Sequence, residues 1–373
     1  MDLCPLEKVK HKVVPGTALP FSLRDQSGRL LLAKGQLLSS AEQLEDLLER
    51  GAWVLMDELA GPRQALFQAP AELLPGLWRR TSEQLARALR PEAAAELDST
   101  LDSLARDLAA LLSRSADLAL FLIVQRDRSE HVTQAVGRAH HAGVCALLIG
   151  QRMNWSQERL LRFVKAAFTM NLGQMALYDR FANQREPITE AQRKLVRQHP
   201  DASLAALQRA GITDTEWLNA VVQHHERPGG SGYPKGLTEV SEMGVALGLL
   251  DVFGALLSTR ASRPSMPPNM ALKQLLQMDR NSPAALALVK EFGVFPPGTL
   301  VKLSSGETAI VVLRSPDPQA PRVMVLSSRH GDILPSPYPR DTTAATHRVA
   351  GILAGHEWRG AISASKLYAK LVA

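Results

Sequence analysis

The stretch HHERPGGSGYPKGL, residues 224–237, places two adjacent histidines directly before a turn that is rich in glycine. Neutral imidazole is a common metal ligand. Neighbouring side chains on a regular helix point about 100° apart, so both histidines reach one ion only near a helix end. Pro228 and Gly229 supply such an end. Taken singly, each histidine is better explained as a surface or core residue than as a ligand, so the surrounding sequence has to decide.

The residues on either side of this stretch, from about 126 to 295, are helical by pattern, and this region includes the histidines at positions 140, 141 and 199. The apolar segment GVALGLLDVFGALL, residues 244–257, contains one carboxylate, Asp251. A buried carboxylate is costly unless a cation or hydrogen-bond donors compensate it. We therefore expect Asp251 to have such a partner.

Four segments together resemble the HD-GYP family over roughly residues 130–290. Residues 224–237 match its signature of His-His-Glu, two residues, Asp-Gly, one residue, Gly-Tyr-Pro, one residue and Gly-Leu, except that Gly229 replaces the aspartate. His141 with Val144 resembles the helix of the first ligand, and RQHP, residues 197–200, resembles the His-Pro segment. LLDVFGALLSTRASR, residues 249–263, resembles the segment whose first aspartate is a ligand.

The resemblance implies an all-helical HD-type core in which histidines and aspartates hold two or three metals, usually iron or manganese. Family members hydrolyse the bacterial second messenger cyclic di-GMP, and a metal-bound hydroxide attacks phosphorus. Two neighbouring cations polarise the phosphate and generate this nucleophile together. In this chain the implied metal ligands are His141, His199, His224, His225 and Asp251.

One segment departs from the family. AAFTMNLGQ, residues 166–174, stands where the family has its His-Asp pair and a phosphate-facing lysine; here these positions are Met170, Asn171 and Gln174, and Gly173 keeps the register. Two dications about 4 Å apart repel by roughly 17 kcal/mol at an effective dielectric constant of about 20, so they need the bridging anion that Asn171 cannot supply. Met170 is a poor ligand for these ions and suits a core position.

At most one transition metal, iron or manganese, is therefore expected, bound weakly by His199, His224 and His225; a cluster without metal is the alternative. The loop is expected to contact a ligand or partner through Gly230, Gly232, Tyr233 and Pro234. In the family this loop contributes to contacts with diguanylate cyclase (GGDEF) domains. Simple structural inheritance of the loop is the alternative, because glycines permit positive φ and Tyr-Pro fixes the exit of the chain.

The chain is predicted to be mainly α, with five parts. Ser39 or Ser40 can begin a helix that Gly51 ends, which indicates an α+β module over residues 1–70. A linker and a helical pair broken at Pro91 follow over 71–125, and the helical HD-GYP-like domain spans 126–295. Alternating runs predict a small β appendage over 296–345, and a helical tail covers 346–373. Helices 77–124 are expected to pair with each other or with a second subunit in a homodimer.

The bulk composition limits the classes of function. The chain has 373 residues, two cysteines (Cys4 and Cys145) and a net charge of +6. Two distant cysteines do not indicate a disulfide framework, and the apolar runs are too short to span a bilayer. The N-terminus has no apolar leader pattern, so we predict a cytoplasmic protein without membrane segments. The basic residues are spread along the chain, which does not favour nucleic acid as a partner.

The leading hypothesis is an HD-GYP-like protein of cyclic di-GMP signalling that is catalytically impaired and acts through ligand binding or protein contact. The alternative is an active metal-dependent phosphodiesterase with a rebuilt site. That alternative needs an anionic residue from elsewhere, such as Asp179 or Glu226, between two metals. A nucleic-acid-binding protein is a third reading, which rests on charge alone.

Overall fold

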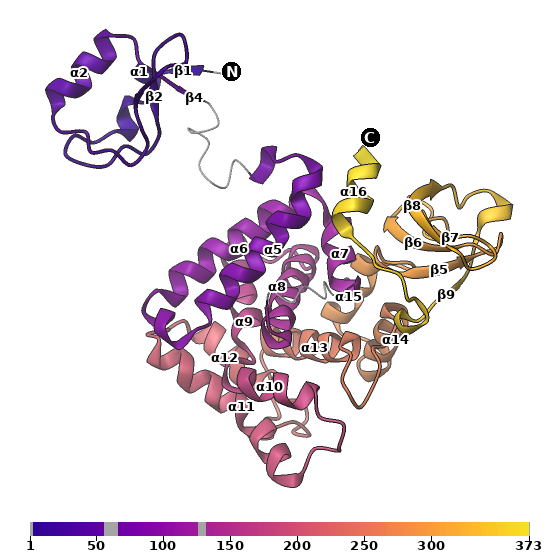
Figure 1. Ribbon diagram of the computed structural model, residues 1–373. Coiled ribbons are helices and arrows are strands. Elements are labelled where there is room, and N and C mark those ends of the chain that lie inside the picture. The colour runs from indigo at the N-terminus through magenta and orange to yellow at the C-terminus, as the bar shows by residue number, and fades with distance from the viewer. Residues whose placement is uncertain (1–2, 56–65, 126–131, 373) are drawn as a thin grey trace. The chain divides into compact units, whose positions relative to one another are not determined.

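The computed structural model describes residues 3–55, 66–125 and 132–372, and the chain divides into two compact units, Met1–Ala69 and Pro70–Ala373 (Figure 1). The first unit mixes short strands with helices, and the second joins a helical core to a β-sheet. The predicted fold class, a helical HD-type core with a small α+β module and a β-rich appendage, is confirmed. No helix within the described residues is long and apolar enough to cross a membrane.

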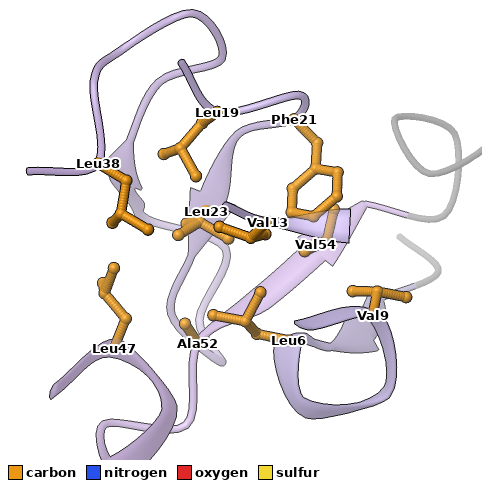
Figure 2. Close-up of a cluster of buried hydrophobic side chains, with 10 residues drawn as sticks. All are labelled: Leu6, Val9, Val13, Leu19, Phe21, Leu23, Leu38, Leu47, Ala52 and Val54. Carbon is orange, nitrogen blue, oxygen red and sulfur yellow. The ribbon is translucent and has the colours of Figure 1, made fainter. Parts of the chain in front are cut away.

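The first unit packs a helix against a small antiparallel sheet. Ser40 caps the helix by accepting from the amide of Gln43, and Gly51 follows the helix with a φ of +65°. Both features agree with the sequence pattern. Figure 2 shows the buried apolar cluster, which includes Leu6, Phe21 and Val54. The elements are β1 (Leu3–Pro5), α1 (Leu6–Val9), β2 (Leu23–Arg24), β3 (Leu30–Leu32), α2 (Ala41–Glu49) and β4 (Trp53–Leu55), and the described strands lie in the order β1-β4-β2-β3.

The second unit begins with α5 (Leu74–Ala88), α6 (Leu97–Arg114) and α7 (Ala116–Gln125). Helix α5 starts inside the segment predicted as a linker, because Pro75 fits the first turn of a helix, where no amide hydrogen is needed. Pro91 ends the helical run as predicted and opens a 3₁₀ segment, Pro91–Glu96. Helices α5 and α6 pack on each other and on α8.

The helical core surrounds α8, which packs against α9, α13 and α15 (Figure 1). The approach of α8 to α9 requires a glycine, because a Cβ at Gly143 would lie 2.2 Å from the Phe168 ring. The elements are α8 (Gln134–Arg152), α9 (Gln157–Thr169), α10 (Met175–Ala182), α11 (Glu190–Arg209), α12 (Thr215–Gln223), α13 (Glu242–Leu257), α14 (Pro268–Met278) and α15 (Pro283–Phe292).

An antiparallel sheet follows the core. In the part of the chain that the structure describes, its order is β8-β7-β6-β5-β9, from β5 (Leu300–Leu303), β6 (Thr308–Leu313), β7 (Arg322–Ser327), β8 (Ile333–Arg340) and β9 (Val349–Ile352). Strand β9 lies within the segment predicted as a helical tail; it is a short edge strand without regular burial, so its sequence shows no alternation. Helix α16 (Ala364–Val372) follows. Arg314 pairs with Asp117 of α7, and the Tyr368 hydroxyl donates to the Val312 carbonyl, so the sheet is fixed to the core.

Candidate metal centre

Three histidines meet where α11 and α12 lie side by side. His199 is on α11, while His224 and His225 directly follow the last residue of α12, Gln223. Among the described residues, these three form a group whose ligand atoms all lie within 4.8 Å of one another. The end of α12 therefore lets two adjacent side chains converge, which a continuous helix would not allow.

The backbone sets the orientation of two of these rings. Nδ1 of His199 donates to the Val196 carbonyl and Nδ1 of His224 donates to the Val221 carbonyl, each at 2.6 Å. With Nδ1 protonated, each neutral ring carries its lone pair on Nε2, and the two Nε2 atoms lie 3.0 Å apart. Two lone pairs that face each other repel, and a cation between them would remove this repulsion. In a tetrahedral site with bonds of about 2.0–2.1 Å, ligand nitrogens lie roughly 3.3 Å apart, so the donor set fits one transition-metal ion.

Burial also keeps these histidines in the ligand form. Loss of solvent lowers the pKa of His199 and of His225 to about 4, and burial followed by the neighbouring His225 lowers the pKa of His224 to about 3. The imidazoles are therefore neutral at pH 7, as metal binding requires.

A different set of contacts surrounds Asp251 on α13. The Asp251 side chain lies in the core, and Nη2 of Arg138 on α8 donates to its Oδ1 at 2.6 Å and to its backbone oxygen at 3.0 Å. Asn171 Nδ2 donates to the same Oδ1 at 2.7 Å. Burial by itself would raise the pKa of Asp251, but the Arg138 guanidinium holds it well below its usual range. The expected partner of Asp251 is thus an arginine and an amide.

The residues at the departed family positions take part in this network or in the core. Gln174 Nε2 donates to Asn171 Oδ1, so a chain of hydrogen bonds runs from Gln174 through Asn171 to Asp251. The Met170 side chain is 2% exposed and belongs to the apolar core. These positions are therefore satisfied by protein groups alone.

His141 stands apart from the three-histidine cluster. It lies on α8 and lines a small cavity with Trp78 and His140. Asp251 Oδ2 lies 3.9 Å from His225 Nε2 of the cluster. The five implied ligands therefore separate into a compact triad, an adjacent carboxylate held by Arg138, and one histidine outside the triad.

The glycine-rich loop is fixed by Glu226. This side chain is 1% exposed, and its two oxygens accept from the backbone amides of Lys235 at 2.7 Å and Leu237 at 3.0 Å. A Cβ at Gly232 would lie 2.4 Å from the Glu226 Cα, so glycine is required there by close packing. Gly230, with a φ of +84°, and Pro234 lie in the same loop.

Tyr233 places the loop against the cluster. Its ring stacks on the His225 ring with centroids 4.5 Å apart, and the Arg197 guanidinium lies 5.1 Å from the Tyr233 ring centroid. The loop therefore touches the histidines through one aromatic ring.

Sequence reasoning predicted that Asp251 has a partner but missed Arg138. The two residues are 113 positions apart, so no local pattern joins them. A signal did exist: Arg138 is the one Lys or Arg in QAVGRAHHAGVCALLIG, residues 134–150, an otherwise apolar and histidine-bearing helix. An arginine on a buried face needs an anion, and Asp251 is the anion on an equally apolar helix.

Comparisons with known proteins agree with the resemblance. Residues 125–282 match the family model of the HD domain. A cyclic di-GMP phosphodiesterase of Pseudomonas aeruginosa is 25% identical over 64% of this chain, and the chain spans 59% of the length of that relative. An HD-GYP-type protein from Bdellovibrio bacteriovorus has a TM-score of 0.44 at 14% identity, over 78% of this chain and 99% of that one. The family model and the relative support the resemblance to HD-GYP proteins.

Proposed function

We propose that this chain is an HD-GYP-like protein of bacterial cyclic di-GMP signalling that acts by binding a ligand or a partner, with hydrolysis lost or greatly weakened. The observation that carries the proposal is the Arg138 guanidinium on Asp251, supported by Asn171. Asp251, the carboxylate that would face a second metal ion, is instead neutralised by the Arg138 guanidinium.

The energetic argument is direct. A dication placed about 4 Å from a guanidinium is repelled by roughly 8 kcal/mol at an effective dielectric constant of about 20. The anionic bridge that would offset this repulsion is an amide, Asn171. The residues present therefore do not fit a two-metal centre.

A single ion of iron or manganese does fit His199, His224 and His225. When bound, such an ion supplies a Lewis acid that attracts a phosphate oxygen. Lys194 and Arg197 line a surface cavity of about 450 Å³ with Pro234 of the loop, where they outnumber one acid, Glu190. These two cations would attract the phosphates of cyclic di-GMP and hold them beside the cluster.

The alternative, an active phosphodiesterase, requires Asp179 or Glu226 to bridge two metals, but both carboxylates already bond to the protein backbone. Both oxygens of Glu226 accept from loop amides. Asp179 accepts from the amide of Ala135 at the start of α8, at 3.0 Å. Each carboxylate has a structural task, so neither supports a rebuilt bridge.

Metal analysis and a hydrolysis assay on the same purified protein test the proposal. For the wild type we expect at most one transition-metal ion per chain, cyclic di-GMP binding by calorimetry and no turnover. His224→Ala should lose the metal ion. His140→Ala is the matched control, because His140 is buried but bonds to Thr81 instead of joining the cluster. Two tightly held ions with steady turnover would contradict the proposal and favour the phosphodiesterase.

Partner contact through the loop is part of the same proposal. A diguanylate cyclase (GGDEF) domain is the partner that the resemblance implies. The half-buried loop residues Tyr233 and Pro234 would contact it. A homodimer through helices 77–124 and a cytoplasmic location stay predictions.

A further inference from the structure

Two adjoining cavities lie in the second unit, away from the histidine cluster. The larger, of about 720 Å³, is bounded by α5, α7, the start of α14, the sheet and the segment 355–365. The smaller, of about 60 Å³, lies among α5, α7 and α8. Both linings include Pro75 and Arg79 of α5 and Leu122 of α7, so the two cavities are neighbours along these helices. The larger volume is typical of small-molecule sites.

Residues that line these cavities carry polar atoms without a hydrogen-bond partner. Six buried side-chain nitrogen or oxygen atoms of the described residues have no hydrogen-bond partner, and three of them belong to the linings. They are Trp78 Nε1, Thr299 Oγ1 and Trp358 Nε1. Trp78 and Thr299 are each 2% exposed. All three groups are donors, and a buried donor without an acceptor is unfavourable, so these walls call for a molecule that carries acceptors.

The charge of the linings restricts that molecule further. Among the described residues, Arg79 is the one Lys, Arg, Asp or Glu in either lining. The Arg79 side chain is half exposed, and its Nε lies 3.6 Å from Glu83 Oε1, which is long for an ion pair. The remaining walls include apolar side chains such as Phe121, Met266 and Ile352. A cation, three donors and apolar walls without an acid are complementary to an apolar body that ends in an anion.

We propose that these cavities bind a small amphipathic monoanion, with an apolar body and a carboxylate. The carboxylate pairs with Arg79, which lines both cavities, while the apolar body fills the space between α7 and the sheet. His199, His224 and His225 line neither cavity, and His141, which lines the smaller one, lies outside that triad. The site is therefore separate from the three-histidine cluster, and the inference does not rest on the proposed function.

Octanoate is the probe, and octanol and octylamine are its neutral and cationic counterparts. Calorimetry on the full chain should show one octanoate per chain with a change in tryptophan fluorescence, because Trp78 and Trp358 line the site. Octanol should bind about tenfold more weakly or not at all, since hydrogen bonds to a charged group are worth about tenfold or more in affinity. Octylamine should not bind.

Two substitutions locate the site. Arg79→Gln should weaken octanoate binding about tenfold without affecting octanol. Arg80→Gln is the matched control, because Arg80 is the exposed neighbour that lines neither cavity, and it should leave octanoate binding unchanged.

A third substitution fills the space without breaking the fold. Gly76 lines the larger cavity from α5, and a Cβ there meets nothing within 4 Å. Gly76→Leu should therefore abolish octanoate binding while Tm stays equal or rises, because leucine favours a helix more than glycine does. Octanoate binding that survives in Gly76→Leu, or is absent from the wild type, overturns the site. Equal binding of octanoate and octanol, unaffected by Arg79→Gln, overturns the assignment to an anion.

Discussion

Replacement of Arg138 by methionine is the sharpest test of how the core tolerates Asp251. Arg138→Met keeps much of the length and apolar volume of the side chain but removes the guanidinium. Asp251 Oδ1 then loses its contact at 2.6 Å, and the Asp251 backbone oxygen loses its contact at 3.0 Å. Arg138 also lies 4.6 Å from the Tyr178 ring centroid, so a cation–π contact disappears as well.

The magnitude follows from burial. The side chains of Arg138 and Asp251 are 8% and 11% exposed, and removal of one partner from a buried pair costs about 3–5 kcal/mol, because the remaining charge is left uncompensated. For a unit of this size, 1 kcal/mol corresponds to roughly 2 °C in Tm. We therefore expect Arg138→Met to lower Tm by about 6–10 °C. Addition of Asp251→Asn should restore part of this loss. The unfolding free energy of the double variant should then be about 1–3 kcal/mol higher than the value expected if the effects of the two single substitutions were additive.

Urea and thermal unfolding of the four proteins measure this cycle. Arg106→Met provides the control, because the Arg106 side chain pairs with Asp102 at 2.8 Å but is 39% exposed. An exposed pair of this kind contributes about 0.2–1 kcal/mol. If Arg138→Met costs no more than Arg106→Met, or if the cycle shows no coupling, the internal-cation argument fails.

The same cation decides whether a second metal can return. Met170→His with Asn171→Asp and Gln174→Lys brings back the family residues, yet Arg138 still repels a second ion. We expect the triple variant to bind no additional metal, whereas the quadruple variant with Arg138→Met binds two ions and gains cyclic di-GMP hydrolysis. Two ions in the triple variant would show that Arg138 is no barrier.

Three further predictions concern other parts of the chain. Tyr233→Ala should weaken association with a diguanylate cyclase domain in a pull-down or by calorimetry; Tyr233→Phe, which keeps the ring stacked on His225, should not, and equal binding by all three proteins would refute the partner role. Removal of bound metal with a chelator should leave Tm within about 2 °C, because a weakly held ion adds little folding free energy; collapse of the fold would contradict weak binding. Hydrogen bonds from Arg340 lower the pKa of Glu307 to about 2, so its contribution to stability is complete above pH 4.5 and is lost as pH falls towards 2. The difference in Tm between wild type and Glu307→Gln should narrow across that window, and a constant difference would exclude this pair as its cause.

Local rules predicted the elements that local chemistry controls. Ser40 begins α2, Gly51 follows it and Pro91 separates α5 from α6, because a cap, a positive φ and a missing amide hydrogen each act within a few residues. Strand β9 escaped prediction because it is held by pairing with β5, which lies about 50 positions earlier. The four residues of β9 are too few to show an alternating pattern from which the pairing could be predicted.

The site divides in the same way. The convergence of His224 and His225 was predictable, because the end of a helix can be read from Pro228 and the glycines that follow. The identity of the cation beside Asp251 was not, because it depends on how α8 crosses α13. The sequence predicts that the buried Asp251 needs a partner, whereas the fold identifies Arg138 as that partner.

The close contact of Gly232 with the Glu226 backbone has a consequence for the use of sequence signatures. Any larger residue at this position collides with the main chain, so a variant without this glycine is selected against by misfolding, whatever chemistry the protein performs. Glu226 is held in the same way by its two amide contacts. These two positions of the motif therefore report the architecture of a loop, and a search that scores them alone does not separate inactive chains from working enzymes.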